Sequence, residues 1–423
     1  MKRIIVLTVL CLLQVSEFAG AQGIEDKRAW NEFSVRAGLP NFFSKALQSG
    51  SVKVAYLGGS ITKQEGWRVH SLNWFKERFP QASFSEVNAA VNGTGSDFGA
   101  FRLKEQVLKH KPDLVFVEFA VNDGKTESAK IIRSMEGIVR QIKQANPYTD
   151  ICFVYTISKY SLEEEQKGML PNSAQQMEKV ADHYGIPSIN FGFEIASMVS
   201  NQQLILEASA KEQKGLKVFS PDGTHPYPET GHVIYQNVLK RSFEKMIPTN
   251  ASSLVKSKLP KPMVSDCYVN TQMVDIKDVK LSSNWELINS KENPSFSEFS
   301  NFLPFIGKAG QSGETITIHF KGRSFGFFDI MGPDAGRVIV EIDGAVKDTI
   351  RRFDPYCSYR RMNYGIIGGL EDKKHTVVLR SLCEPFDKTA ILSNKESITK
   401  NPEVYKPNNL YIGKILIEGK ILK

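Results

Sequence analysis

The run Leu114-Val115-Phe116-Val117-Glu118-Phe119 is apolar at every position but one, and it leads into Ala120-Val121-Asn122-Asp123. A strand that is buried on both faces has this composition, and such strands occur in parallel sheets covered by helices on both sides. The next segment repeats apolar residues at helical spacing and stops before Pro147; these residues are Ile131, Met135, Ile138 and Ile142. The first predicted unit is therefore a buried strand followed by an amphipathic helix.

The same alternation of strand and helix extends to both sides of this unit. Further strands are predicted at residues 52–57, 84–91, 151–157 and 186–191, and further helices at residues 72–79, 173–184 and 231–246. Strands joined by helices pair in parallel, because each helix returns the chain to the same edge of the sheet. The predicted fold class of residues 22–247 is α/β, a parallel sheet wrapped by helices.

The character of the sequence changes after residue 247. Residues 248–264 are rich in Pro, Ser and Lys, which predicts a linker. Beyond it, turn signals such as Pro333-Asp334 and Asp343-Gly344 separate short alternating runs at residues 315–320, 338–342, 376–379 and 411–417. Such runs without a helical period predict an all-β sandwich domain over residues 265–423. Two domains also agree with the length of 423 residues, which exceeds what one core usually organises.

The first 21 residues have the pattern of a signal peptide. Lys2 and Arg3 precede an apolar run at residues 4–13, and Ala19-Gly20-Ala21 supplies the small residues of a cleavage site. We therefore expect an exported protein, periplasmic or extracellular. No later segment approaches the roughly 20 apolar residues of a membrane span, so none is expected.

Charge and cysteine content exclude some classes of partner. The net charge is +8, but no block of Lys and Arg interleaved with aromatic residues is present, so a nucleic acid is not an expected partner. Cys152 lies in an apolar run and is predicted to be a buried thiol. The pairing of Cys267, Cys357 and Cys383 is left open, as is the oligomeric state.

Four polar motifs occur at predicted strand ends or in the last loop of the first domain. Ser60 follows Gly58-Gly59 after the first strand, Gly93 follows the second, Asn122 follows the third, and Asp222-Gly223-Thr224-His225 precedes the final helix. In an open parallel sheet, ligands bind beyond the carboxyl ends of the strands. A serine hydroxyl becomes a nucleophile when an imidazole takes its proton and a carboxylate orients that imidazole. The motifs supply all three groups and an amide that can stabilise an oxyanion.

The order of these blocks resembles the SGNH (GDSL-type) hydrolase superfamily over about residues 50–247. The resemblance implies a flavodoxin-like, three-layer α/β/α fold, with Ser60 as nucleophile, His225 as base and Asp222 as the residue that orients it. It also implies an oxyanion hole formed by the Ser60 N–H, the Gly93 N–H and the Asn122 side chain. This sequence departs from the family pattern in two places: Gly59 replaces the usual aspartate before the serine, and Val121 replaces a common glycine before Asn122.

Three residues near these motifs are candidates for substrate binding: Trp67, Arg68 and Arg102. The planar fork of an arginine can bind a sugar hydroxyl or an acidic sugar. The alternative is that the arginines pair with nearby carboxylates and that Trp67 lies in the core, and both interpretations stay open. Asp123 is expected to be a structural hydrogen-bond acceptor. His183 and His232 are expected to have packing or surface roles, and no carboxylate is placed to orient His70.

No metal, phosphate or dinucleotide motif is found, so no metal site and no cofactor are expected. The second domain shows no catalytic constellation. It resembles the accessory modules of carbohydrate-active enzymes, whose sugar sites use exposed aromatic residues. The candidates here are Trp285, Tyr356, Tyr359 and Tyr364, for which core packing is the alternative; the domain can also serve only to shape the active-site cleft.

Three functions follow from these observations. The first is a secreted esterase that removes O-acetyl or other short acyl groups from a polysaccharide or oligosaccharide, which makes an acetylated glycan the expected partner. The second is a lipolytic esterase or thioesterase that uses the same site. The third is a non-catalytic glycan-binding protein with a degenerate hydrolase fold.

Overall fold

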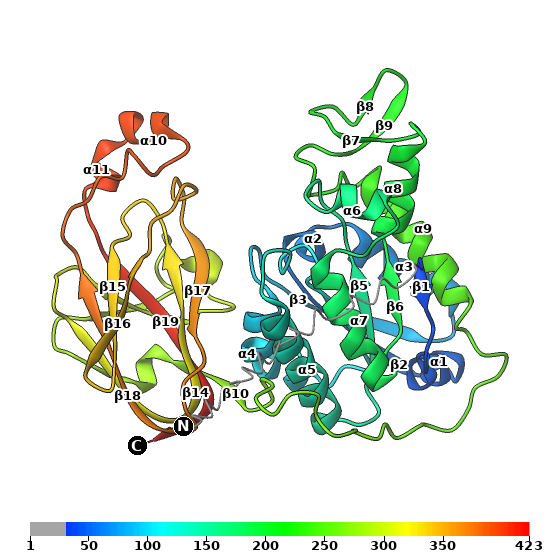
Figure 1. Cartoon of the computed structure of the whole chain (residues 1–423), viewed down its shortest axis with the longest axis horizontal. Helices are drawn as coiled ribbons and strands as arrows, with labels where there is room; N and C mark the ends of the chain where they lie inside the picture. The colour runs from blue at the N-terminus through cyan, green and yellow to red at the C-terminus, as the bar shows by residue number, and fades with distance from the viewer. Residues whose placement is uncertain (1–30, 423) are drawn as a thin grey trace, which may run out of the picture.

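The computed structural model describes residues 31–422, so the predicted signal peptide lies outside the described residues. Residues 31–247 contain a six-stranded sheet in the order β1-β6-β5-β4-β2-β3 (Figure 1). Five strands are parallel, and the short edge strand β1 is antiparallel to β6. The strands are β1 (Phe33–Ser34), β2 (Ser51–Gly58), β3 (Ser83–Ala90), β4 (Leu114–Glu118), β5 (Asp150–Tyr155) and β6 (Ser188–Asn190). The predicted parallel α/β sheet is confirmed.

Helices cover both faces of this sheet (Figure 1). They are α1 (Pro40–Leu47), α2 (Ser60–Lys63), α3 (Trp67–Arg78), α4 (Ser96–Gln106), α5 (Ser128–Ala145), α6 (Leu162–Gln166), α7 (Asn172–Tyr184), α8 (Gly192–Ser200) and α9 (Gly231–Glu244), with a 3-10 turn η1 (Leu108–His110). The helices α1, α2, α4, α6 and α8 were not predicted. Within residues 31–422, no helix combines the length and the apolar character needed to cross a bilayer.

The pleat of β4 explains why its sequence is almost continuously apolar. Val115 and Val117 pack into one core cluster with side chains of α4, α5 and α7. Leu114 and Phe116 point the other way, into a second cluster with α1, α3, α8 and α9. Successive side chains of a strand face opposite sides of the sheet, so a strand between two helical layers buries both sets.

A small three-stranded sheet is inserted between α8 and α9. It consists of β7 (Ile205–Glu207), β8 (Glu212–Gln213) and β9 (Leu216–Ser220), in the order β7-β9-β8. It projects at the top of Figure 1, and β9 leads directly into the loop that carries Asp222 and His225. The sequence analysis did not predict this insertion.

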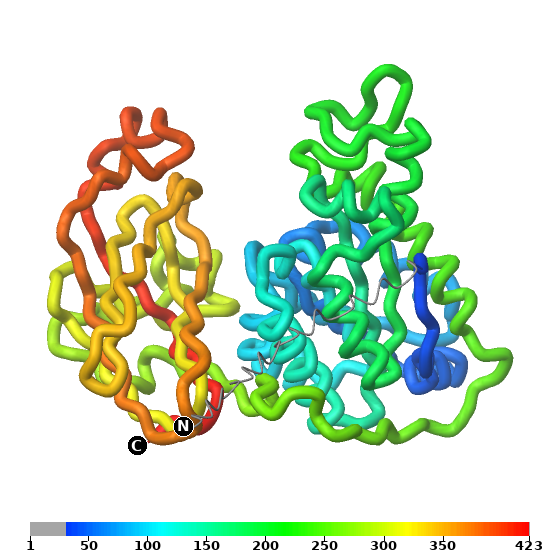
Figure 2. Tube along the Cα trace, viewed as in Figure 1, coloured from blue at the N-terminus to red at the C-terminus, as the bar shows by residue number. Residues whose placement is uncertain are grey.

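Residues 248–264 follow the surface of the first domain without forming a helix or strand (Figure 2). The segment is fastened to the first domain at several places. Val255 N–H donates to the Asn41 side chain at 2.7 Å, and the N–H groups of Met263 and Val264 donate to the buried Glu136 carboxylate at 2.5 and 2.9 Å. The predicted linker is therefore held against the first domain along its length.

Residues 265–422 form an antiparallel β domain. Its strands are β10 (Thr271–Asp275), β11 (Lys280–Leu281), β12 (Glu286–Asn289), β13 (Phe305–Ala309), β14 (Thr315–Met331), β15 (Arg337–Ile342), β16 (Ala345–Arg351), β17 (Arg361–Ile367), β18 (Lys373–Leu382) and β19 (Leu410–Leu422). The long β14 pairs with β18 through its first half and with β17 through its second half, and a register shift in its pairing with β19 lies between these halves. Strands with inward apolar residues thereby enclose a core, as the predicted all-β fold requires.

Four short helical segments also occur in this domain: η2 (Ile276–Asp278), η3 (Ser297–Phe299), α10 (Lys395–Lys400) and α11 (Pro402–Tyr405). None was predicted, because each is too short to show a helical period. The cysteines within residues 31–422 are all free thiols, and Cys152 is buried in β5 as predicted.

The two domains share one apolar cluster. Phe98 and Phe101 of α4 lie in the same buried cluster as Tyr268 and Phe328 of the second domain. The Phe98 and Phe328 ring centroids are 4.6 Å apart. An ion pair between Lys414 and Glu105 (2.8 Å) adds a polar contact across the same boundary. The domains are therefore packed on each other rather than joined only by the linker.

Candidate active site

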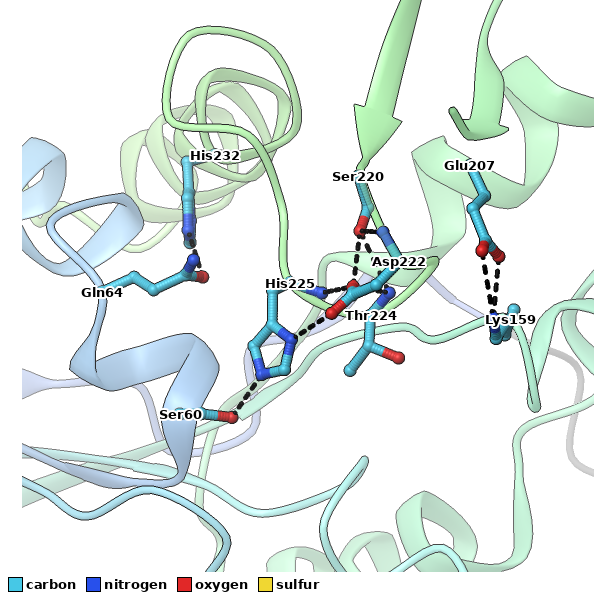
Figure 3. Close-up of polar contacts among 9 residues, drawn as sticks. All are labelled: Ser60, Gln64, Lys159, Glu207, Ser220, Asp222, Thr224, His225 and His232. Carbon is cyan, nitrogen blue, oxygen red and sulfur yellow. Dashed lines mark hydrogen bonds and ion pairs between the residues drawn. The ribbon is translucent and has the colours of Figure 1, made fainter. Parts of the chain in front are cut away.

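Ser60, His225 and Asp222 form a continuous chain of hydrogen bonds (Figure 3). Ser60 is the first residue of α2, directly after β2, and its Oγ lies 2.8 Å from His225 Nε2. His225 Nδ1 lies 2.7 Å from Asp222 Oδ2. The carboxylate accepts a hydrogen bond from Nδ1–H, so Nε2 is the ring nitrogen left to accept the serine proton. The arrangement can generate a serine nucleophile.

The Asp222 carboxylate is held by donors from its own loop. Its Oδ1 accepts from the Ser220 hydroxyl at 2.9 Å, from Thr224 N–H at 2.9 Å and from His225 N–H at 2.8 Å. Burial by itself would raise the pKa of Asp222, but the bond from the His225 ring and these three donors hold it below its ordinary value. The carboxylate therefore stays ionised and fixed in direction at neutral pH.

Glu118, at the end of β4, supports the turn that carries Ser60. This fully buried carboxyl accepts from Thr62 Oγ1 at 2.7 Å, from Thr156 Oγ1 at 2.8 Å and from the Gly59 N–H. Burial raises its pKa. The group ties the ends of β4 and β5 to α2. The sequence analysis did not single it out, although the one charged residue in the apolar run 114–119 was a signal.

Asn122 lies directly beside the residue before the nucleophile. A Cβ atom built on Gly59 would come within 2.0 Å of Asn122 Oδ1, so the amide occupies the space that a side chain at residue 59 would fill. Within residues 31–422 the Asn122 amide has no hydrogen-bond partner, which leaves its N–H groups available to a ligand. An aspartate, which is usual at this position in the family, would collide with Asn122 here, whereas Gly59 leaves room for the amide.

Gly93 follows β3 at the same edge of the sheet. Its φ of +68° is in the left-handed region, which glycine adopts without strain. Val91 N–H bonds the Gly58 carbonyl at 3.1 Å, so the Gly93 turn begins next to the end of β2. The four sequence blocks are thus gathered at one edge of the sheet.

The inserted sheet contacts the loop that carries Asp222 and His225. Lys159 N–H donates to the Gly223 carbonyl at 2.7 Å, and Lys159 Nζ pairs with Glu207 of β7 at 2.9 Å (Figure 3). Gly223 has φ +75°, and a Cβ there would meet Glu207 Oε2 at 2.7 Å. These residues were not predicted, because the pairing depends on the fold of the insertion.

Two other candidate bases of the first domain, His232 and His183, make structural contacts instead. His232 is fully buried: its Nδ1 accepts from Trp67 N–H and its Nε2 donates to Gln64, both at 3.1 Å (Figure 3). Burial, with the nearby His70 and His225, lowers the pKa of His232 to about 3 and keeps it neutral. His183 is exposed at the end of α7 and bonds a backbone carbonyl of the linker.

The prediction that Trp67, Arg68 and Arg102 contact the substrate is wrong. Trp67 is fully buried in the aromatic core beside the sheet. Arg68 is 5% exposed and its guanidinium pairs with Glu86. Arg102 is fully buried and donates to the Gly58 carbonyl at 3.0 Å. The alternative interpretation, a core tryptophan and internally bound arginines, describes all three.

Tyr364 of the second domain reaches the glycine loop of the first. Its hydroxyl donates to Asp97 Oδ1 at 2.8 Å and accepts from Gly95 N–H at 3.2 Å. Its ring stacks on Phe98, with centroids 4.6 Å apart and planes 13° from parallel. The candidate sugar-binding role of Tyr364 is therefore wrong. The residue instead fixes the backbone two positions beyond Gly93.

Asp123, the residue after Asn122, bonds the same glycine loop that Tyr364 contacts. Its Oδ1 accepts from Ser96 N–H at 3.1 Å, which confirms the predicted role as a structural acceptor. Burial, with the neighbouring Asp97, raises the pKa of Asp123 to about 7, against the effect of the Ser96 hydrogen bond. The Gly93–Gly95 turn and the Asn122 loop are therefore held together from behind the site.

A pocket of about 350 Å³ opens beside the triad. Asn122 and Thr224, the neighbour of His225, form part of its wall. The rest of the wall mixes polar residues with apolar ones, among them Ala120, Val121, Tyr160 and Pro171. Within residues 31–422 no group of three or more His, Cys, Asp and Glu side chains is arranged to hold a metal ion.

Comparisons with known proteins agree with this geometry. Residues 56–230 match the GDSL-like Lipase/Acylhydrolase family. The crystal structure of a two-domain esterase (CEX) active on acetylated mannans resembles this chain with a TM-score of 0.69 and 20% identity, covering 89% of this chain and 93% of its own. The structure of such an esterase co-crystallized with mannopentaose gives a TM-score of 0.68 and 21% identity over the same shares. No curated protein matches the sequence.

At this level of identity the structural likeness shows a shared fold, and it extends over both domains. The family match covers the strands and loops that carry Ser60, Gly93, Asn122 and His225. Residues 56–230 form a GDSL-like lipase/acylhydrolase domain, and the chain is therefore a carboxylic ester hydrolase with a second, antiparallel β domain.

Proposed function

We propose that this protein is an exported serine esterase that removes acetyl or other short acyl groups from a glycan, with Ser60 as nucleophile, His225 as base and Asp222 as the orienting acid. The observation that carries the proposal is the hydrogen-bond chain from Ser60 Oγ through His225 to Asp222. His225 accepts the Ser60 proton while Oγ forms a bond to the ester carbonyl carbon. The carbonyl oxygen becomes an oxyanion.

Three donors are proposed to stabilise this oxyanion: the N–H groups of Ser60 and Gly93 and the Asn122 amide. Support comes from the unpartnered Asn122 amide beside Gly59. Collapse of the tetrahedral intermediate breaks the bond to the sugar oxygen, which takes the proton from His225 and leaves. Water then attacks the acyl-enzyme with His225 again as base, releasing the carboxylic acid and restoring Ser60.

The choice of a glycan rests on two supporting observations. The fold resembles a two-domain esterase active on acetylated mannans over most of both chains. The pocket beside the triad combines polar side chains with an aromatic ring, and these groups suit the hydroxyls and the C–H face of a sugar. Export is supported by the signal-like pattern of residues 1–21.

Acetate release from a panel of acetylated glycans tests the proposal, with p-nitrophenyl esters of increasing chain length run in parallel. We expect release from at least one glycan, preference for acetyl over long acyl esters, and loss of turnover in Ser60→Ala with the fold retained. Preference for long chains would favour a lipolytic enzyme. Glycan binding without any turnover would favour a binding protein.

A further inference from the structure

Tyr160 is the most exposed large hydrophobic residue in the part of the chain that the structure describes, at 79%. A single exposed ring needs no explanation by itself. This ring, however, lines the pocket beside the triad and has two ammonium groups near it. Lys125 Nζ and Lys159 Nζ are each 5.9 Å from its centroid.

The backbone that carries Tyr160 is fixed relative to the candidate catalytic residues. Its neighbour Lys159 donates to the Gly223 carbonyl, next to Asp222, and is paired with Glu207. On the other side, the Ser161 hydroxyl bonds the Ser158 carbonyl at 3.2 Å and Glu165 Oε1 at 3.0 Å. The ring therefore projects from an anchored turn, at a fixed position relative to Asp222 and His225.

Lys125 reaches the same ring from the Asn122 loop. It lies within a turn that is closed by a bond from Thr126 N–H to the Asp123 carbonyl, at 2.8 Å, and it lines the pocket. Lys159 is neutralised by Glu207, but no carboxylate within residues 31–422 lies within ion-pair distance of Lys125. Its ammonium donors remain available to a ligand that also contacts Tyr160.

A sugar unit matches this combination of groups. A pyranose ring has an apolar face of C–H groups, which can cover a flat aromatic ring, and a rim of hydroxyls that accept hydrogen bonds. The pocket supplies the ring of Tyr160, the ammonium of Lys125 and other polar groups of the wall, namely Ser158, Ser161 and Asn172. A sugar can contact both kinds of group, whereas a long acyl chain would leave the polar groups without hydrogen-bond partners.

We propose that Tyr160 is a stacking platform for a sugar unit of the acylated glycan, adjacent to the unit whose ester is cleaved, and that Lys125 donates hydrogen bonds to its hydroxyls. The inference rests on the proposed glycan esterase function and specifies where the glycan lies. It makes Tyr160 a determinant of substrate selectivity.

The test compares Tyr160→Ala and Tyr160→Phe with the parent enzyme on two substrates, an acetylated oligosaccharide and ethyl acetate, which has no sugar. We expect Tyr160→Ala to lower the ratio of the two kcat/KM values about tenfold, mainly through KM for the oligosaccharide. Tyr160→Phe keeps the ring and should keep the ratio within about twofold. Tyr148→Ala, at a 39% exposed tyrosine before β5, at the opposite edge of the sheet, is the matched control.

A binding experiment separates this inference from the proposed function. In the Ser60→Ala protein, calorimetry with the deacetylated oligosaccharide should show binding that Tyr160→Ala weakens about tenfold. If the enzyme hydrolyses the acetylated glycan but neither the ratio nor the affinity changes in Tyr160→Ala, the platform is refuted and the function stands. If the glycan binds through Tyr160 but no variant releases acetate, the platform stands and the proposed function fails.

Discussion

Asn122 has a half-buried amide whose loss should affect chemistry more than stability. Because the side chain has no hydrogen-bond partner within residues 31–422, Asn122→Ala should leave the thermal midpoint nearly unchanged. Turnover should fall about 10²–10³-fold, since one oxyanion donor is removed. Steady-state kinetics with ethyl acetate measures the effect. A loss of less than about threefold would show that the amide does not face the oxyanion.

Asp123 should make stability depend on pH. Its pKa is raised to about 7 in the folded chain, against about 3.9 for an unfolded aspartate, so the folded state holds the proton more tightly. The resulting stabilisation is complete below the unfolded pKa and is lost as the pH rises through 7. Asp123→Asn removes this titration while keeping an acceptor for Ser96.

Urea unfolding at about pH 5 and pH 8 measures the difference. The parent chain should lose roughly 2–3 kcal/mol more of its free energy of unfolding over this interval than Asp123→Asn does. Other buried carboxyls titrate in both proteins and cancel in the comparison. Identical pH slopes would show that Asp123 is ionised throughout.

At the level of single residues, sequence reasoning worked where the chemistry is local. Asp222 and His225 are three residues apart in one loop, and Ser60 directly follows a strand, so their approach could be predicted from strand ends. Whether Arg68 or Arg102 contacts a ligand could not be predicted in this way. It depends on which side of a helix faces the core, and both arginines face it.

Among the structural elements, the turn between β2 and α2 leaves no room for a side chain at residue 59. A methyl group on Gly59 would lie 2.0 Å from Asn122 Oδ1, so Gly59→Ala must displace the amide. We expect a loss of turnover close to that of Asn122→Ala, and a double variant no worse than either single one, because both remove the same donor. Additive losses in the double variant would place the effect of Gly59→Ala elsewhere.

The elements that could be predicted are those with long periodic patterns. Such elements are the strands β2 to β5 and the helices α5 and α7, which begin and end within a few residues of their predicted bounds. The strands are marked by apolar runs because both faces of the sheet are covered, and α5 is marked by its one apolar side. Helix α4 is buried along most of its length and lacks a polar side, so no periodicity marks it. The inserted strands β7 and β8 are too short to leave a pattern.

For the whole molecule, the contact between domains should influence the site. Tyr364→Phe keeps the ring stacked on Phe98 but removes the hydroxyl that bridges Asp97 and Gly95. The lost bond to a carboxylate should lower the free energy of unfolding by about 1.5–3 kcal/mol. Turnover should also fall several-fold, because the turn that contains Gly93 loses its support.

Thermal unfolding and steady-state kinetics on this variant test the coupling. Tyr356→Phe, at a 66% exposed tyrosine of the same domain, is the control for a lost hydroxyl at the surface. Equal behaviour of the two variants would mean that the second domain does not support the glycine loop. The sequence predicted two domains, but their shared cluster joins residues more than 200 positions apart, which no local pattern reveals.

The central claim, that Ser60 is the acylated nucleophile, is tested most directly by mass spectrometry after reaction with a p-nitrophenyl phosphonate. The activated serine oxygen attacks phosphorus and displaces p-nitrophenolate, and the phosphonyl group stays bound to the serine. We predict one adduct, on the peptide that contains Ser60, formed in step with loss of esterase activity and absent from His225→Ala. An adduct elsewhere, or full turnover by Ser60→Ala, would contradict the claim.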